Sequence, residues 1–385
     1  MFYKNLLLTA LATTGSAQTL LEALSAQNSS LSSLNALLGT QTELVASLGA
    51  ASNITILAPN NAALAAFLNS SAGAAAASNP DAVAALLSYH VLQGTYDASV
   101  FSETPQFIPT LLNNATYSNV TGGQVVQLEL VDEDDTQTAT IFSGLLSNSS
   151  VVTPNLNFTG GVIHVIDTIL TVPQPPSDTA LALGLTALVG ALTTAGLAET
   201  VDGLSDVTIF APSNTAFQNI GSATGNLTTE QLSEILTYHV INGTIAYSSL
   251  LANTTITTLN GQNLTVTIEE GDIFIGSAKV VIPNVLVSNG VVHVIDNVLN
   301  PANSTAAPDL EDDDSGEPAF SGASSATDVP FTSGITATTT APAATSTGAG
   351  GAAATSTSSA GAAMHTGAMG AAALFGAAGV FAANM

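Results

Sequence analysis

The sequence contains no cysteine, which excludes a disulfide framework, a thiolate nucleophile and a cysteine-ligated zinc site. Basic residues are almost absent too. Lys and Arg total two, and because Lys4 lies in a predicted leader, Lys279 is the remaining basic side chain apart from histidine. The formal net charge is -26. A chain this acidic cannot neutralise phosphates by releasing counterions, so a nucleic-acid partner is excluded and anionic lipid headgroups are disfavoured.

The two ends of the chain have the composition of targeting signals. A short polar start, an apolar run and small residues predict a signal peptide over residues 1–17. At the other end, small residues followed by a terminal apolar tail predict a glycosylphosphatidylinositol (GPI) attachment propeptide over 361–385, with Ser358 or Ser359 as the attachment residue. A membrane-spanning helix is the alternative, but it would normally be longer and flanked by basic residues.

An internal repeat organises the sequence between these signals. Three segments each occur twice and in the same order: 53–63 and 206–216, 86–91 and 235–240, and 161–167 and 290–296. Such a repeat indicates two structural units of the same kind. We therefore predict one domain over 18–172 and a second over 177–301, joined by a short proline-rich linker at 173–176.

Each repeat predicts helices followed by a sheet. The opening segments carry leucines at helical spacing, and a short apolar strand then ends at Pro59 or Pro212, where proline blocks further pairing. Asn60 and Ser213 follow as natural caps for a new helix. Alternating polar and apolar residues near 126–130 predict half-buried strands, so the fold class is α+β with a mostly antiparallel sheet.

Residues 302–360 have a different composition from the repeats. Ser, Thr, Ala and Gly dominate and the apolar periodicity disappears. This composition predicts a disordered stalk between the second domain and the C-terminal signal.

The three repeated segments resemble the fasciclin domain family. In its members a segment ending in Ala-Pro, a Tyr-His pair and a closing strand similar to Gly-Val-Ile-His-Val-Ile-Asp occur in this order. The resemblance implies two wedge-shaped β-sandwiches with packed helices and an extracellular or membrane-anchored role in adhesion or matrix. Together with the predicted leader, stalk and anchor signal, it most resembles a tandem, GPI-anchored surface protein of the fungal type.

The same resemblance singles out the Tyr-His pair as an interaction element. The pair occurs here as Tyr89-His90 and Tyr238-His239. We expect these four residues to be the possible interaction site of each domain.

The histidines of the repeats also suggest an active site, but their pattern favours a structural role. Strand alternation groups His164 with Val162 and Ile166, which is typical of a hydrogen-bonded, partly buried side chain. The sequence has no ligand cluster with metal-site spacing and no nucleophile elbow. We therefore expect no catalytic residue, no cofactor and no metal, and we predict that the protein is not an enzyme.

Acceptor sequences for N-glycosylation are abundant, as in a protein of the secretory pathway. Asn53 and Asn242 adjoin predicted core segments, so they are the two least expected to carry glycans. The candidate sites are Asn28, Asn69, Asn114, Asn119, Asn148, Asn157, Asn226, Asn253, Asn263 and Asn303.

These features predict an extracellular adhesion or wall-organising glycoprotein whose partners are glycans or proteins of the cell surface or matrix, with a lipid anchor to the membrane. The alternatives are a passive structural component of the wall and a membrane protein of the vacuolar or secretory system. The oligomeric state stays open. Because few cations pair the carboxylates, the sequence also predicts that stability improves toward mildly acidic pH.

Overall fold

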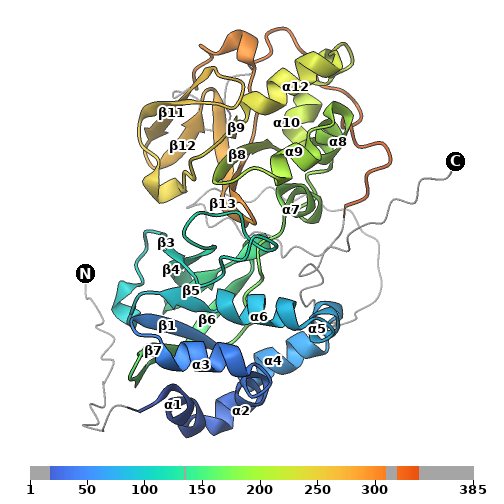
Figure 1. Cartoon of the computed structure of the whole chain (residues 1–385). Helices are drawn as coiled ribbons and strands as arrows, with labels where there is room; N and C mark the ends of the chain where they lie inside the picture. The colour runs from blue at the N-terminus through green and yellow to red at the C-terminus, as the bar shows by residue number, and fades with distance from the viewer. Residues whose placement is uncertain (1–17, 134–135, 309–318, 338–385) are drawn as a thin grey trace, which may run out of the picture.

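The computed structural model describes residues 18–133, 136–308 and 319–337. The predicted signal peptide, the candidate attachment residues Ser358 and Ser359, and the C-terminal tail lie outside these residues. Two domains with the same plan follow one another along the chain (Figure 1). The described residues contain no helix both long enough and apolar enough to cross a membrane.

The first domain begins with helices and ends with strands. Its elements are α1 (Leu20–Ala26), α2 (Asn28–Leu38), α3 (Thr42–Ala50), β1 (Ile54–Pro59), α4 (Asn61–Leu68), α5 (Ser71–Ala77), α6 (Pro80–Tyr89), β2 (Val91–Gln93), the 3-10 helix η1 (Ala98–Val100), β3 (Gln106–Pro109), β4 (Val125–Glu133), β5 (Thr136–Phe142), η2 (Gly144–Leu146), β6 (Asn148–Phe158) and β7 (Gly161–Ile166).

The second domain repeats this order. Its elements are α7 (Pro176–Ala182), α8 (Thr186–Ala195), α9 (Ala198–Asp202), β8 (Val207–Pro212), α10 (Asn214–Asn219), α11 (Gly221–Thr224), α12 (Thr229–Tyr238), β9 (Val240–Ile241), η3 (Ser248–Leu250), β10 (Thr254–Thr257), β11 (Asn263–Glu269), β12 (Asp272–Ile275), β13 (Ala278–Val287), β14 (Gly290–Ile295) and η4 (Pro301–Asn303).

Each domain is built on one nearly closed sheet of seven strands. The strand order is β2-β1-β7-β6-β5-β4-β3 in the first domain, and the second domain has the same order. The pairs β1–β7 and β8–β14 are parallel, and the other pairs are antiparallel. The Leu111 N–H donates to the Val91 carbonyl at 2.8 Å and joins the two edges of the first sheet. The predicted α+β class is confirmed, and the two domains share one topology, as the internal repeat predicts.

The repeated Ala-Pro segment has the same structure in both domains. β1 and β8 are buried along their whole length and end at Pro59 and Pro212. The Asn60 side chain then accepts the Ala63 N–H at 2.8 Å and caps α4, while Ser213 caps α10. A strand stop and a helix cap encoded by adjacent residues explain why this segment could be recognised from the sequence.

The two domains contact each other through the β3–β4 edge of the first and the β13–β14 turn of the second (Figure 1). Phe107 stacks on Tyr247, with ring centroids 3.9 Å apart and an interplanar angle of 8°. Val125, Leu286 and Val291 complete a separate apolar cluster around this stack. The junction therefore has a small hydrophobic core of its own.

Polar contacts surround that core. The Asn119 N–H donates to the Ser288 carbonyl at 2.8 Å, and the Gln124 side chain donates to the Val287 carbonyl at 3.0 Å. From the linker, the buried Gln174 accepts the Ser288 N–H at 2.8 Å. The proline-rich linker is therefore part of a packed junction, and it does not act as a free tether.

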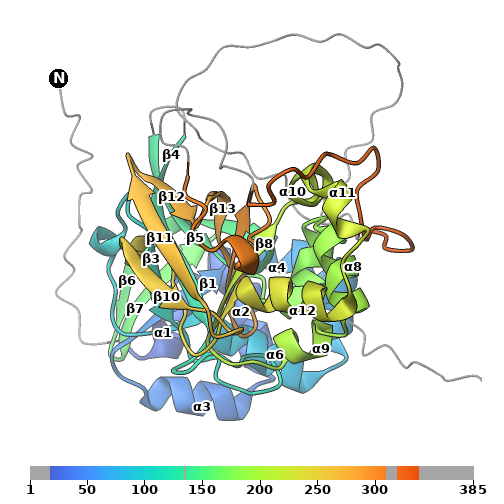
Figure 2. The same cartoon turned by 90° about the horizontal axis from the view of Figure 1, so that it is seen from above.

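Part of the predicted stalk has a defined place in the structure. Residues 319–337 lie along α8, α10 and α11 of the second domain (Figure 2). Phe320, Ala323, Val329 and Phe331 of this segment pack against the core of that domain. The sequence composition did not indicate this, because these contacts depend on single residues and not on a repeating apolar pattern.

Candidate functional site

The first Tyr-His pair lies where α6 ends and β2 begins. The Tyr89 side chain is fully buried, and its hydroxyl donates to the Val125 carbonyl at the start of β4, at 2.8 Å. His90 Nδ1 lies 2.8 Å from the Leu86 carbonyl of α6, and His90 Nε2 accepts the Leu170 N–H at 3.0 Å. The pair thus connects the end of α6 to β4 on one side and to the segment after β7 on the other.

The second pair makes the same connections in its own domain. The Tyr238 hydroxyl donates to the Asn263 carbonyl of β11 at 3.0 Å. His239 Nδ1 lies 2.7 Å from the Ile235 carbonyl, and His239 Nε2 accepts the Leu299 N–H at 2.9 Å. Two pairs with matching hydrogen bonds indicate one structural device, used once in each domain.

These contacts bear on the interaction role expected for the four residues. The exposed fractions are 0% for Tyr89, 3% for His90, 2% for Tyr238 and 2% for His239. None of the four therefore offers surface to a partner in this conformation. Direct recognition through them would require the C-terminal ends of α6 and α12 to open.

The other two repeated histidines lie on the closing strands. His164 Nε2 lies 2.8 Å from the Tyr96 carbonyl, and its Nδ1 accepts the Asn155 N–H at 3.3 Å. His293 makes the same two contacts, with Ala246 and Asn284. The expected hydrogen bonds are present, but both histidines are fully buried and not partly buried as expected.

Two asparagines, whose backbone N–H groups donate to these histidines, were not identified from the sequence. Asn155 and Asn284 both adopt a positive φ, 59° and 60°, next to irregularities in β6 and β13. Each follows the pattern Val-Val-x-Pro-Asn, at 151–155 and 280–284. This fourth repeated segment was available as a signal, because asparagine is among the few residues that adopt this backbone region readily.

The hydrogen bonds fix the ring protonation of all four histidines. A backbone N–H can only donate, so the ring nitrogen that accepts it carries no proton. His90 and His239 are therefore protonated on Nδ1, and His164 and His293 on Nε2. Burial lowers the pKa of His90, His239 and His293 to about 4 and lowers the pKa of His164.

Neutral histidines with both nitrogens in use are poorly suited to proton transfer or metal binding. Within residues 18–133, 136–308 and 319–337, no group of three or more His, Cys, Asp or Glu side chains could hold a metal ion. The lowered pKa values act against the sequence-based expectation for pH. Protonation of these four buried histidines would destabilise the folded state at mildly acidic pH, whereas the relief of surface repulsion would stabilise it.

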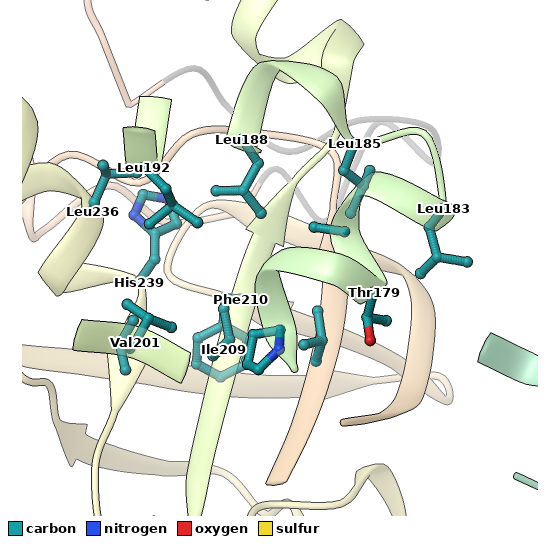
Figure 3. Close-up of a pocket in the computed structure, with 14 residues that line it drawn as sticks. Thr179, Leu183, Leu185, Leu188, Leu192, Val201, Ile209, Phe210, Leu236 and His239 are labelled. Carbon is teal, nitrogen blue, oxygen red and sulfur yellow. The ribbon is translucent and has the colours of Figure 1, made fainter. Parts of the chain in front are cut away.

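An apolar cavity of about 20 Å³ lies among α7, α8 and β8 (Figure 3). Leu188 and Leu192 line it from α8, and Ile209 and Phe210 line it from β8. His239 reaches its border, but both ring nitrogens are already hydrogen-bonded. Because this volume is close to that of one water molecule and its walls are apolar, it is a packing gap.

The sequon asparagines, in contrast, lie on the surface of both domains. Eight of the ten predicted sites are exposed: Asn28, Asn69, Asn114, Asn148, Asn157, Asn226, Asn253 and Asn263. Asn119 is half-buried beside the domain junction, and Asn303 is half-buried with its side-chain nitrogen donating to the Ala319 carbonyl at 3.2 Å. Asn53 and Asn242, the two sites least expected to carry glycans, are also exposed.

Two like α+β domains, each locked by a buried Tyr-His pair and each presenting its sequons outward, define a modular scaffold protein. The chain belongs to the fasciclin domain family, whose domain pattern matches residues 29–173 and 183–301. Proteins of this family are generally adhesive or structural, not catalytic.

Two fungal proteins are similar to about three quarters of this chain. A fasciclin-like arabinogalactan protein from Arthroderma benhamiae is 38% identical over 78% of this chain and 71% of its own length. The fasciclin-like arabinogalactan protein elcF from Phaeosphaeria nodorum is 32% identical over 76% of this chain and 91% of its own. A fasciclin domain pair from the insect cell adhesion molecule Fasciclin I is 17% identical, with a TM-score of 0.36, over 72% of this chain and 99% of that one. The fungal relatives suggest an extracellular place and a role in adhesion or the cell wall.

Proposed function

We propose that this protein is a glycosylated, non-enzymatic adhesion or wall-organising scaffold on the outer face of the cell. It is synthesised with a cleaved leader and held at the membrane by a GPI anchor attached near Ser358 or Ser359. Its partners are glycans or proteins of the cell surface or matrix, which contact exposed surface of the two domains. The buried Tyr-His pairs maintain the shape of that surface.

The observation that carries this proposal is the outward position of the sequons on both domains. Eight of the ten predicted asparagines are exposed, although the chain has many buried polar residues. A glycan needs an accessible side-chain nitrogen, so this arrangement fits a chain that passes through the secretory pathway. The buried histidines support a non-catalytic role, because both ring nitrogens of each are already hydrogen-bonded within the domain.

Glycopeptide mapping of protein from its own or a related cell tests the proposal site by site. We expect glycans on exposed asparagines such as Asn28 and Asn226, and none on Asn303, whose nitrogen is engaged with Ala319. Asn28→Gln should remove one glycan mass, and the matched Asn303→Gln should leave the mass of the glycans unchanged. Bare asparagines at all exposed sequons would contradict passage through the secretory pathway.

A passive structural role is the main competing function. Binding assays with purified wall polysaccharides and with cells separate the two. Saturable binding that survives mild salt supports an adhesive scaffold, and its absence favours a passive wall component. With 28 acidic and two basic residues in the chain, a partner that depends on positive charge from this protein is not expected.

A further inference from the structure

Residues 319–337, named the strap from here on, follow the second domain and lie across its helical face (Figure 2). The strap is anchored where it begins. The side chains of Asn300 and Asn303 both donate to the Ala319 carbonyl, at 3.1 and 3.2 Å, and Ala319 itself is buried. The start of the strap is therefore tied to the end of the domain.

The middle of the strap is held through its main chain. The Ser222 N–H donates to the Ser324 carbonyl at 3.0 Å, and the Ser324 N–H donates to the Ser222 hydroxyl at 2.8 Å. The Ala326 N–H donates to the Gln218 carbonyl at 2.9 Å, while the Gln218 side chain donates to the Ala326 carbonyl at 3.2 Å. Paired main-chain bonds of this kind are how grooves hold extended peptides.

The end of the strap is held by an aromatic side chain. Phe331 meets Phe217 of α10 edge to face, with ring centroids 5.9 Å apart and an interplanar angle of 80°. Phe331 also has a φ of 62°, a region that bulky residues rarely adopt. A bulky residue keeps such a conformation only where surrounding contacts impose it, so the strap is shaped by the surface beneath it.

Two glycines in the domain are explained by the close approach of the strap. A Cβ on Gly190 of α8 would lie 1.8 Å from the Phe331 carbonyl oxygen, and a Cβ on Gly221 would lie 2.2 Å from Ala326 Cβ. Glycine inside a helix is less favourable than alanine, so Gly190 lowers the stability of α8. A glycine at this position is explained if another part of the chain must come close to the helix backbone. The strap backbone occupies that space.

We propose that the face formed by α8, α10 and α11 is a peptide-binding groove and that the strap of the same chain is its occupant. The strap carries one charged residue, Asp328, and otherwise small, polar or apolar residues, which suits a strongly acidic molecule. Because the strap is covalently attached, its effective concentration at the groove is high. A docked strap also shortens the reach of the chain toward its proposed anchor, and release of its 19 residues would free at most roughly 65 Å of extended chain.

Hydrogen exchange on the purified full-length protein tests this proposal, and the test does not depend on the proposed function. We expect slow exchange in the strap, notably at the N–H groups of Ser324 and Ala326. Gly190→Ala should speed that exchange at least tenfold, because its methyl group displaces the strap. The matched Gly49→Ala, in α3 where no atom lies within 4 Å, should leave strap exchange unchanged.

A second pair of variants guards against misfolding. Gly221→Ala should release the strap, and Gly225→Ala, which meets open space, should not. If Gly190→Ala also exposes β8, Phe331→Ala within the strap replaces it as the test and should raise strap exchange with β8 still protected. Fast strap exchange in the unmodified protein, or unchanged exchange in Phe331→Ala, would overturn the proposal. If the strap exchanged slowly only in a dimer, and this protection disappeared when the protein was diluted, the strap would be bound by a second copy. That result would overturn the proposal that the strap occupies the groove of its own chain.

Discussion

At the scale of single residues, the histidines of the repeats serve as structural acceptors. Each receives a backbone N–H on one ring nitrogen, so protonation of that nitrogen would break the bond and place a charge in the core. Their burial and the lowered pKa values are consistent with each other. The histidine of the Tyr-His pair therefore contributes to stability at neutral pH only in its neutral form.

This account predicts that the protein loses stability as the pH falls from about 6.5 to 4. In this window the unfolded chain binds protons on these histidines, whose ordinary pKa is 6.5, while the folded chain does not until about pH 4. The loss is about 2 kcal/mol per histidine at pH 5 for His90, His239 and His293. Thermal unfolding at pH 7, 6 and 5 measures it.

Carboxyl groups with raised pKa values act in the opposite direction. Burial raises the pKa of Glu129, Asp178 and Asp202, so their protonation favours the folded state as the pH falls. All three are only partly buried, so solvent screens their effect. Repeating the series at about 0.5 M salt screens surface repulsion and should leave the histidine effect in place. A melting temperature that stays level or rises toward pH 5 would refute the assignment.

The Tyr89 hydroxyl gives a second prediction at the same scale. Tyr89→Phe keeps the buried ring but leaves the Val125 carbonyl without the hydroxyl it accepts from. We expect the free energy of unfolding to fall by about 1–2 kcal/mol, as measured by urea unfolding. Tyr117→Phe is the control, because the Tyr117 side chain is only half-buried, and it should change stability by less than about 0.5 kcal/mol. Equal effects of the two substitutions would contradict the structural role of the Tyr-His pair.

At the scale of secondary structure, the sequence predicts best those features that depend on residues adjacent in the chain. The strand stop at Pro59 and the cap at Asn60 are adjacent, and the alternating residues 126–130 do lie in β4, although the polar Gln127 is buried there as well. The three repeated segments then place the same elements in both domains. These local signals were sufficient for the α+β class and for the two-domain organisation.

Features that depend on distant partners could not be predicted in this way. The strap lacks apolar periodicity, and its docking depends on Gly190 and Gly221, which are far away in the sequence. The burial of the Tyr-His pairs depends on Val125 and Leu170 as hydrogen-bond partners. A resemblance to a family could place the pair in the sequence but could not show which way its side chains point.

At the scale of the whole molecule, the junction makes the two domains one packed unit. The Phe107–Tyr247 stack forms its centre, and hydrogen bonds from Asn119, Thr121 and Gln124 surround it. A partner that engages both domains would therefore meet two surfaces at a fixed spacing. Fixed spacing reduces the entropy lost when both surfaces bind at once.

Two substitutions at the junction separate the contribution of the stacked rings from that of the buried Tyr247 hydroxyl. Phe107→Ala removes the stack and should increase opening of the junction about tenfold, measured as faster exchange of the Asn119 N–H. Tyr247→Phe keeps the stack and removes a hydroxyl that is buried without a hydrogen-bond partner among the described residues, so it should be neutral or stabilising by about 1 kcal/mol. Unchanged exchange in Phe107→Ala would show that the stack does not hold the domains together.

The central claim is that this fasciclin-family protein acts outside the cell as an anchored scaffold. Treating intact cells with phosphatidylinositol-specific phospholipase C tests it most directly, with release of the protein and cell attachment measured on the same sample. The account predicts that the protein appears in the medium, still glycosylated, and that attachment of the treated cells falls. A protein that stays with the cells while its C-terminal tail remains detectable, with attachment unchanged, would contradict it and favour a membrane protein of the vacuolar or secretory system.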